Sequence, residues 1–478
     1  MKMLMASVSR IAAAALLGGC AAGVTTAARA ETLIEALTAA YKSNPTLSGA
    51  RARQRGVDEN VALAKADGRP AASLGGTYNE QIARPEQLIN TGAGLTRLAV
   101  TPLRSAVGQG SVSVPLYSGG TVRNAIHAAE RRVEAGQNDL RGTEASVFAN
   151  VVGAYMDVIR DSQIAALNLQ NVKALEVNLR ASKERFEVGD LTRTDVAQSE
   201  SRLALARATA QQAQAQLVAS RENYNALVGH APEALEDAPP LAGLPATAEA
   251  AVSTALADNP DIRSAQKSRE AARYDIKAAE GAVLPRLSAF VQGSYTDYLR
   301  SENTLISAAN VKSAQAGASL TIPLYQGGRP GAAQRQAVAS ESAAIDRSIE
   351  VERGVVADVR ATYARWQAAL QNIEATRTAV SSAELSLEGV KAENSVGSRT
   401  ILDILNAEQE ALNARVQLVS AQRDAYVAAF SLLASMGHAQ ASDLAIDPAI
   451  LYDPQANYRR VRGKIFDFDF DKRAGPSD

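Results

Sequence analysis

The sequence is poor in cysteine, in aromatic side chains and in net charge. It has one cysteine among 478 residues, 4% aromatic residues, and 50 basic side chains against 51 acidic ones. The balanced charge gives no indication of a nucleic-acid partner. Low aromatic content, together with abundant Ala, Leu, Glu, Gln and Arg, favours long helices over a thick globular core.

Long hydrophobic runs are also lacking, because no stretch after the N-terminus approaches the ~18 apolar residues of a transmembrane helix. At the N-terminus, Lys2 and Arg10 give a positive start, Ile11 to Val24 form an apolar segment, and the small-x-small pattern Ala28-Arg29-Ala30 follows. We therefore expect residues 1–30 to be a signal peptide. An alternative is a lipoprotein signal with a lipid on Cys20, but the first repeat starts directly after Ala30, which favours cleavage there. The mature chain would then contain no thiol and no disulfide.

The sequence also lacks a recognisable catalytic constellation. Its three histidines, His127, His230 and His438, do not have the spacing of metal ligands. There is no P-loop and no Gly-x-Ser-x-Gly motif. We therefore expect no enzymatic activity, no cofactor and no bound metal.

An internal repeat organises the chain. Val114-Pro115-Leu116-Tyr117 recurs 208 residues later as Ile322-Pro323-Leu324-Tyr325, and Asn44-Pro45 recurs 215 residues later as Asn259-Pro260. The first copy thus contains seven extra residues between Pro70 and Val112. We predict a first structural repeat at 31–229, a Pro-rich linker at 230–246, a second repeat at 247–437 and a C-terminal segment at 438–478.

Each repeat predicts two short helices, two strands, a very long helix, a glycine turn and a helix of about 38 residues. In the strands, apolar and polar residues alternate. The apolar positions are Ala72, Leu74, Gly76, Tyr78, Val112, Val114, Leu116, Leu287, Ala289, Val291, Tyr295, Ala318, Leu320, Ile322 and Leu324. Such alternation is expected in a half-buried sheet of a soluble protein and also in a membrane β-strand. Four such strands, two in each repeat and flanked by long helices, favour membrane strands.

The helices have a seven-residue apolar rhythm, which predicts left-handed coiled-coil packing. The seams contain Val151, Val158, Ala165, Val172, Leu179 and Phe186; Val359, Trp366, Ile373, Val380 and Leu387; Leu203, Ala210, Leu217 and Tyr224; and Ile404, Ala411, Leu418, Ala425 and Leu432. A helix over 121–187 would be roughly 100 Å long.

Four strands cannot close a membrane barrel, and open edges are not tolerated in lipid. Two copies would supply eight strands, which leave room only for side chains, whereas three copies supply twelve and leave a lumen. We therefore predict a mainly α protein with membrane β: a homotrimer with a 12-stranded barrel, four strands per protomer, and a long coiled-coil helical barrel.

The chain resembles the TolC family of outer-membrane factors over nearly all of residues 31–437. The most specific segment, Ser395 to Leu405, is similar to the second periplasmic turn of the family, and Arg185 to Gly189 with Thr194-Asp195-Val196 is similar to the first. The resemblance implies a channel-tunnel in outer-membrane lipid, with a collar from 230–246 and 438–478. It also implies a passive exit duct that works with a periplasmic adaptor and an inner-membrane ABC or RND-type pump, in type I protein secretion, multidrug efflux or both.

The resemblance assigns the gate to the two turns. Asp403 would form a negative ring at the narrow periplasmic mouth. Arg399 would act as a latch toward positions that correspond to Thr194 and Asp195.

The chain departs from the family pattern at two positions of the gate, with Asn394 in place of Tyr and Asn406 in place of a second Asp. One latch contact and the cation selectivity should therefore be weaker. Gly189 and Gly397 are predicted helix C-caps, and in relatives such turns also receive the adaptor.

Two further interpretations are kept open. A periplasmic coiled-coil scaffold without channel activity would explain the heptads but not the paired strands. The tail from Asp453 to Asp478, with its alternating run Phe466 to Asp471, is expected to be partly disordered, with packing on the collar as the alternative.

Overall fold

The computed structural model describes residues 30–83, 86–90, 92, 94–99, 104–300, 310–444 and 446–471. The predicted signal peptide before Ala30, with Cys20, lies outside the described residues. Among the residues that are described, no helix combines the length and apolar character needed to cross a membrane.

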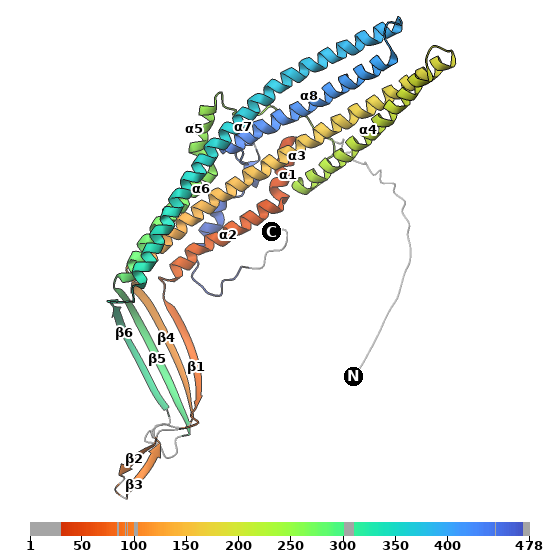
Figure 1. Ribbon diagram of the computed structural model, residues 1–478. Coiled ribbons are helices and arrows are strands. Elements are labelled where there is room, and N and C mark those ends of the chain that lie inside the picture. Colours follow the sequence, from red (N-terminus) through yellow and green to blue (C-terminus); the bar gives the residue numbers. More distant parts are fainter. Residues whose placement is uncertain are drawn as a thin grey trace, which may run out of the picture.

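Two long helical hairpins form most of the molecule (Figure 1). The first consists of α3 (Thr121–Glu187) and α4 (Arg193–Val228), and the second of α7 (Arg329–Ser395) and α8 (Ile401–Met436). The predicted helix over 121–187 is confirmed at both ends. Gly120 precedes α3 with φ 79°, a left-handed conformation that favours glycine and turns the chain from strand into helix.

Shorter helices lie beside the sheet-proximal halves of α3 and α7 (Figure 1). They are α1 (Leu33–Ser43), α2 (Pro45–Ala66), α5 (Ala248–Asp258) and α6 (Pro260–Glu280). Asn44 and Asn259 each cap the helix that begins at the following proline. Their side-chain amides also donate to Leu227 O and Ser435 O, at 2.9 Å in both cases. The caps thereby fix each short helix to the end of α4 or α8.

A four-stranded antiparallel sheet continues from the helices in the order β1-β4-β5-β6. The strands are β1 (Ala71–Glu80), β4 (Arg104–Tyr117), β5 (Arg286–Arg300) and β6 (Asn310–Thr321). The register aligns Ala72, Val112, Val291 and Ala316 in one row and Ser73, Ser111, Gln292 and Gln315 in the next. The predicted alternation therefore gives one apolar and one polar face.

The first repeat contains more strands than the sequence predicted. A separate hairpin of β2 (Glu86–Asn90) and β3 (Leu95–Ala99) lies between β1 and β4. The prediction of two strands was wrong here because each of the added strands is only five residues long, and both lie in the stretch between Pro70 and Val112 where the first repeat has extra residues. An antiparallel hairpin can be inserted between paired strands without changing their register, since its two ends lie close together.

The core follows the predicted seams. Val151, Val158 and Ala165 are buried along α3, and Val359 and Leu432 are buried between α7 and α8. At the middle of α3, the buried Tyr155 donates its hydroxyl to Glu31 O at 2.9 Å and to Glu236 O at 2.7 Å. Glu31 and Glu236, which lies in the segment after α4, are thus both fixed at the midpoint of the helix.

Part of the C-terminal segment is packed on the helical body. Helix α9 (Pro454–Val461) lies on α2, with Tyr458 against the buried Val61. The tail is therefore packed on α2 at α9, and the expectation of partial disorder stays a prediction for the residues after it. Asp453 caps α9 by accepting from Gln455 N at 2.8 Å, with proline at the next position.

Candidate functional site at the ends of the helical hairpins

The predicted gate residues lie at the two turns farthest from the sheet (Figure 1). Gly189 has φ 87° and Gly397 has φ 82°. Asp190 N donates to Arg185 O at 2.8 Å, and Ser398 N donates to Glu393 O at 3.0 Å. These bonds close each helix around a left-handed glycine, so the predicted C-caps are confirmed.

Each returning helix begins with a capping box. Thr192 donates its amide and hydroxyl to Asp195 Oδ2 at 2.9 and 2.7 Å, and Thr400 does the same to Asp403 Oδ2 at 2.9 and 2.8 Å. Hydrogen bonds from the Thr192 hydroxyl and amide lower the pKa of the Asp195 carboxyl. The Thr400 amide, then its hydroxyl, lowers the pKa of Asp403. Both carboxylates are therefore ionised at neutral pH.

The second turn has a further network around Arg399. Arg399 Nε donates to Glu393 Oε2 at 2.7 Å, and Asn394 Nδ2 donates to the Arg399 carbonyl oxygen at 2.7 Å. Asn394 thus braces the backbone of Arg399. The predicted contact of Arg399 with Thr194 and Asp195 of a neighbouring turn stays a prediction.

The two hairpins are joined by polar side chains just behind the turns. Arg202 Nη2 on α4 donates to Asn406 Oδ1 on α8 at 2.8 Å. Glu408 is only 8% exposed and accepts from Asn178 Nδ2 on α3 at 2.8 Å and from Lys391 Nζ on α7 at 2.9 Å. Because its partners come from both hairpins, Glu408 couples one hairpin to the other.

The sequence analysis named Asn406 but missed the contacts of Glu408, although one signal for them exists. Lys183 and Glu200 in the first hairpin have the same spacing as Lys391 and Glu408 in the second, 208 residues later, and also form an ion pair, at 2.7 Å. A repeated lysine–glutamate pair across a predicted turn indicates an interhelical bridge. It does not reveal which copy is buried.

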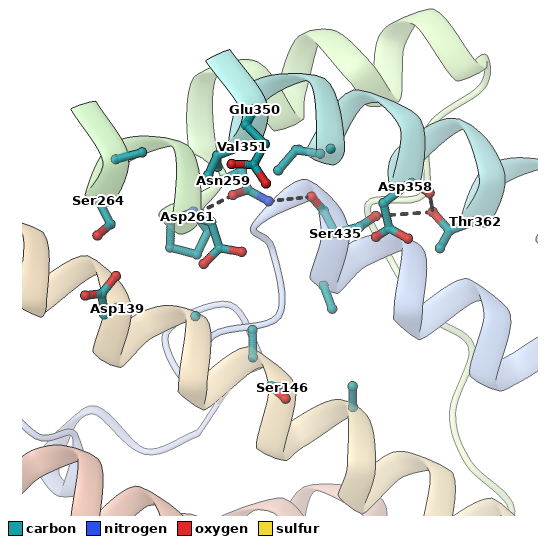
Figure 2. A pocket seen from close by; sticks show the side chains of 18 of the residues that line it. Asp139, Ser146, Asn259, Asp261, Ser264, Glu350, Val351, Asp358, Thr362 and Ser435 are labelled. Atoms are coloured by element: carbon teal, nitrogen blue, oxygen red, sulfur yellow. Dashed lines mark hydrogen bonds between the residues drawn. The ribbon is translucent and has the colours of Figure 1, made fainter. Parts of the chain in front are cut away.

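Farther from the turns, a hollow of about 930 Å³ opens between α3, α6, α7 and α8 (Figure 2). Asp139 and Asp261 face it, and burial, with the nearby Asp139 carboxylate, raises the pKa of Asp261. The hydrogen bonds drawn in Figure 2 stabilise the helices that line the hollow. For example, Thr362 Oγ1 donates to Asp358 O of the same helix at 2.8 Å. In the described part of the chain, no group of three or more His, Cys, Asp or Glu residues is placed to hold a metal ion.

Two long hairpins that continue into a sheet with one apolar face define the protomer of an outer-membrane channel-tunnel. Residues 36–230 and 251–438 match the family described as "Outer membrane efflux protein", and the chain belongs to this family. The protein is therefore an exit duct of the outer membrane, and its helical tunnel extends into the periplasm.

Individual relatives agree with this assignment. The chain is 34% identical over 460 residues to outer membrane efflux protein BepC of Brucella suis biovar 1, covering 95% of this chain and 96% of that one. It is 26% identical over 433 residues to outer membrane protein TolC of Vibrio cholerae, covering 88% and 94%. The crystal structure of the Campylobacter jejuni CmeC outer membrane channel has a TM-score of 0.72 at 16% identity, covering 91% and 89%. The predicted resemblance to the TolC family is confirmed.

Proposed function

We propose that three copies of this chain form the exit duct of a tripartite export system, and that contact with an adaptor and a pump opens its periplasmic end. The observation that carries the trimer is the sheet, in which β1 and β6 are edge strands. In lipid those edges must pair with other copies, and twelve strands enclose a lumen. The name of BepC, an efflux protein, supports export as the task.

The gate lies at the turns, where the Asp403 carboxylates of three copies form a ring of negative charge. Such a ring attracts cations and repels anions at the mouth. Asn406 adds no charge to the ring, so the ring is weaker than one with two aspartates per copy. The Asn406 side chain accepts a hydrogen bond from Arg202 instead.

The latch is Arg399. Its pairing with Glu393 uses Nε, while a guanidinium carries five donor hydrogens in a planar fork. The remaining donors suit the Asp195 carboxylate and Thr194 of the neighbouring copy. The exposed turns with Gly189 and Gly397 are the contact sites for the hairpin tips of a periplasmic adaptor, and an ABC or RND-type pump in the inner membrane supplies the substrate.

The latch is tested by conductance in planar bilayers. Arg399→Ala should raise the resting conductance several-fold, and Asp195→Ala should do the same from the other side of the contact. Leu191→Ala is the matched control, because Leu191 occupies the position of Arg399 in the first turn. An assembled Arg399→Ala trimer with unchanged conductance would remove the latch from the mechanism and leave the duct intact.

The alternative of a periplasmic scaffold without channel activity is not favoured by any observation above. Membership of an outer-membrane efflux family and the apolar face of the sheet both argue against it.

A further inference from the structure

A short segment near the C-terminus presents large apolar side chains to solvent. Ile465, Phe466, Phe468 and Phe470 are 62%, 77%, 88% and 79% exposed. Three of the seven phenylalanines of the chain thus lie within five residues. The rings of Phe468 and Phe470 meet edge to face, with centroids 6.4 Å apart. We name residues 465–470 the phenylalanine segment.

The phenylalanine segment is held at the junction between the helical body and the sheet. Asn457 Nδ2 donates to the buried Asp58 at 2.8 Å, which docks α9 on α2. Farther along, Lys65 Nζ donates to Arg462 O at 3.1 Å, and Arg69 Nη1 donates to Lys464 O at 2.5 Å. Helix α2 ends at Ala66 and β1 begins at Ala71.

The distance from this junction to the exposed rings is short. Phe466 follows Lys464 by two residues, so their Cα atoms are within about 7 Å of each other. On the sheet side, Ala72 and Leu74 begin the apolar row of β1, and Leu74 is 89% exposed. The phenylalanine segment is therefore placed at the level where the apolar face of the sheet begins.

Asp469, between Phe468 and Phe470, and Asp471, directly after Phe470, are paired with basic side chains that precede the segment. Asp471 accepts from Arg460 Nη2 at 2.7 Å and pairs with Lys464 Nζ at 3.3 Å, while Asp469 pairs with Lys464 at 3.2 Å. The Arg460 and Lys464 side chains lower the pKa of Asp471 to about 2. These two pairs lower the cost of placing the rings of Phe468 and Phe470 next to an apolar phase.

We propose that the phenylalanine segment inserts its aromatic side chains into the phospholipid of the periplasmic leaflet of the outer membrane. Aromatic residues favour the boundary between water and acyl chains, and a single short segment binds there reversibly. In a trimer the three segments would set the height of the sheet in the bilayer. The inference rests on the outer-membrane location of the family, not on the gate.

The test uses depth-dependent fluorescence quenching on the full-length protein. The chain has one tryptophan, so Trp366→Phe with Phe468→Trp gives a single probe in the segment. The protein is reconstituted into nanodiscs of phosphatidylethanolamine and phosphatidylglycerol that contain lipids brominated at shallow or deep acyl positions. We expect the emission to fall by at least half with shallow bromines and by less with deep ones. A Val396→Trp probe at the far turn is the control and should not be quenched.

Absence of quenching at residue 468 would overturn the proposal, and a blue-shifted but unquenched emission would show that a neighbouring copy covers the rings. Phe470→Trp in the same background gives a second reading if one substitution disturbs the segment. Resting conductance, measured on the same samples, separates the outcomes: an unquenched probe in a normal channel removes the lipid contact and leaves the duct intact.

Discussion

The two helical hairpins of the protomer have equal lengths and repeated ion pairs, but their long helices are buried to very different extents. Helices α3 and α7 each contain 67 residues. Arg207–Glu176 in the first hairpin recurs as Arg415–Glu384 in the second, at 2.7 and 2.6 Å. Yet 19 residues of α3 are buried against 4 of α7, so the repeat conserves the shape of the hairpin and not its environment.

The difference follows from position. Helix α3 packs against α2, α4, α6 and α8, whereas α7 packs against α5, α6 and α8 at one side of the protomer. Exposed apolar residues of α7 stand where α3 has polar ones: Val338, Ile349 and Leu370 match Glu130, Arg141 and Ser162. A helix with unpartnered apolar residues at its edge is suited to being covered by another copy.

The largest expected effect is on the free energy of unfolding, and it compares Tyr155 of α3 with its matched residue Tyr363 of α7. Tyr155→Ala removes a buried ring and two hydrogen bonds, and should lower the free energy of unfolding by about 3–5 kcal/mol. Tyr363→Ala removes a half-buried ring with one bond to Ala246 O, and should cost about half as much. Thermal unfolding followed by circular dichroism compares them. Equal shifts would mean that α7 is as deeply buried in the assembly as α3.

Assembly should depend on the second hairpin more than on the first. Ile349→Glu places a charge on the apolar edge of α7 and should weaken the trimer at least about tenfold, because a charge buried without a partner costs more than 1.4 kcal/mol. Arg141→Glu, the matched change on α3, should leave the trimer unchanged. Light scattering after size exclusion measures the mass. A stable trimer of the Ile349→Glu variant would place the interface elsewhere.

The matched ion pairs behind the turns sharpen the comparison further. Glu408→Ala leaves the Asn178 amide in a buried site without its acceptor and should cost about 1–3 kcal/mol. Glu200→Ala breaks an exposed pair and should cost at most about 1 kcal/mol. Denaturant titration gives both values. If the two variants are equally stable, Glu408 does not couple the hairpins.

The smallest effect concerns acid pH, where the hairpins should behave alike. The folded-state pKa values of Asp195 and Asp403 are lowered below the ordinary 3.8, so their capping is complete above that value and is lost as pH falls through the lowered one. Amide protection at the start of α4 and α8 should therefore decrease together as the pH falls below 3.8. Hydrogen exchange checks this, with Asp195→Asn and Asp403→Asn as variants that should lack the transition.

The sequence predicted those parts of the fold that depend on neighbours along the chain. Heptads, Asn-Pro caps and the glycines at the turns set the helix bounds through local geometry, and strand alternation set the two faces of the sheet. Helix α9 was missed although Asp453-Pro454 follows the same capping rule as Asn44-Pro45. The burial of Glu408 could not be predicted, because it depends on Asn178, a residue 230 positions away on the other hairpin.

A rigid tilt of either long helix would turn about the tyrosine at its midpoint. Tyr155 is 34 residues from the start of α3 and 32 from its end, and its matched residue Tyr363 holds α7 at the same point. Each arm is thus about 50 Å long. A tilt of one degree about the pivot displaces the tip by about 0.9 Å, a simple consequence of the arm length. The end of the helix next to the sheet would move in the opposite direction by a similar distance. A bilayer that holds the sheet in place would therefore also restrict the movement of the turn at the other end of the helix.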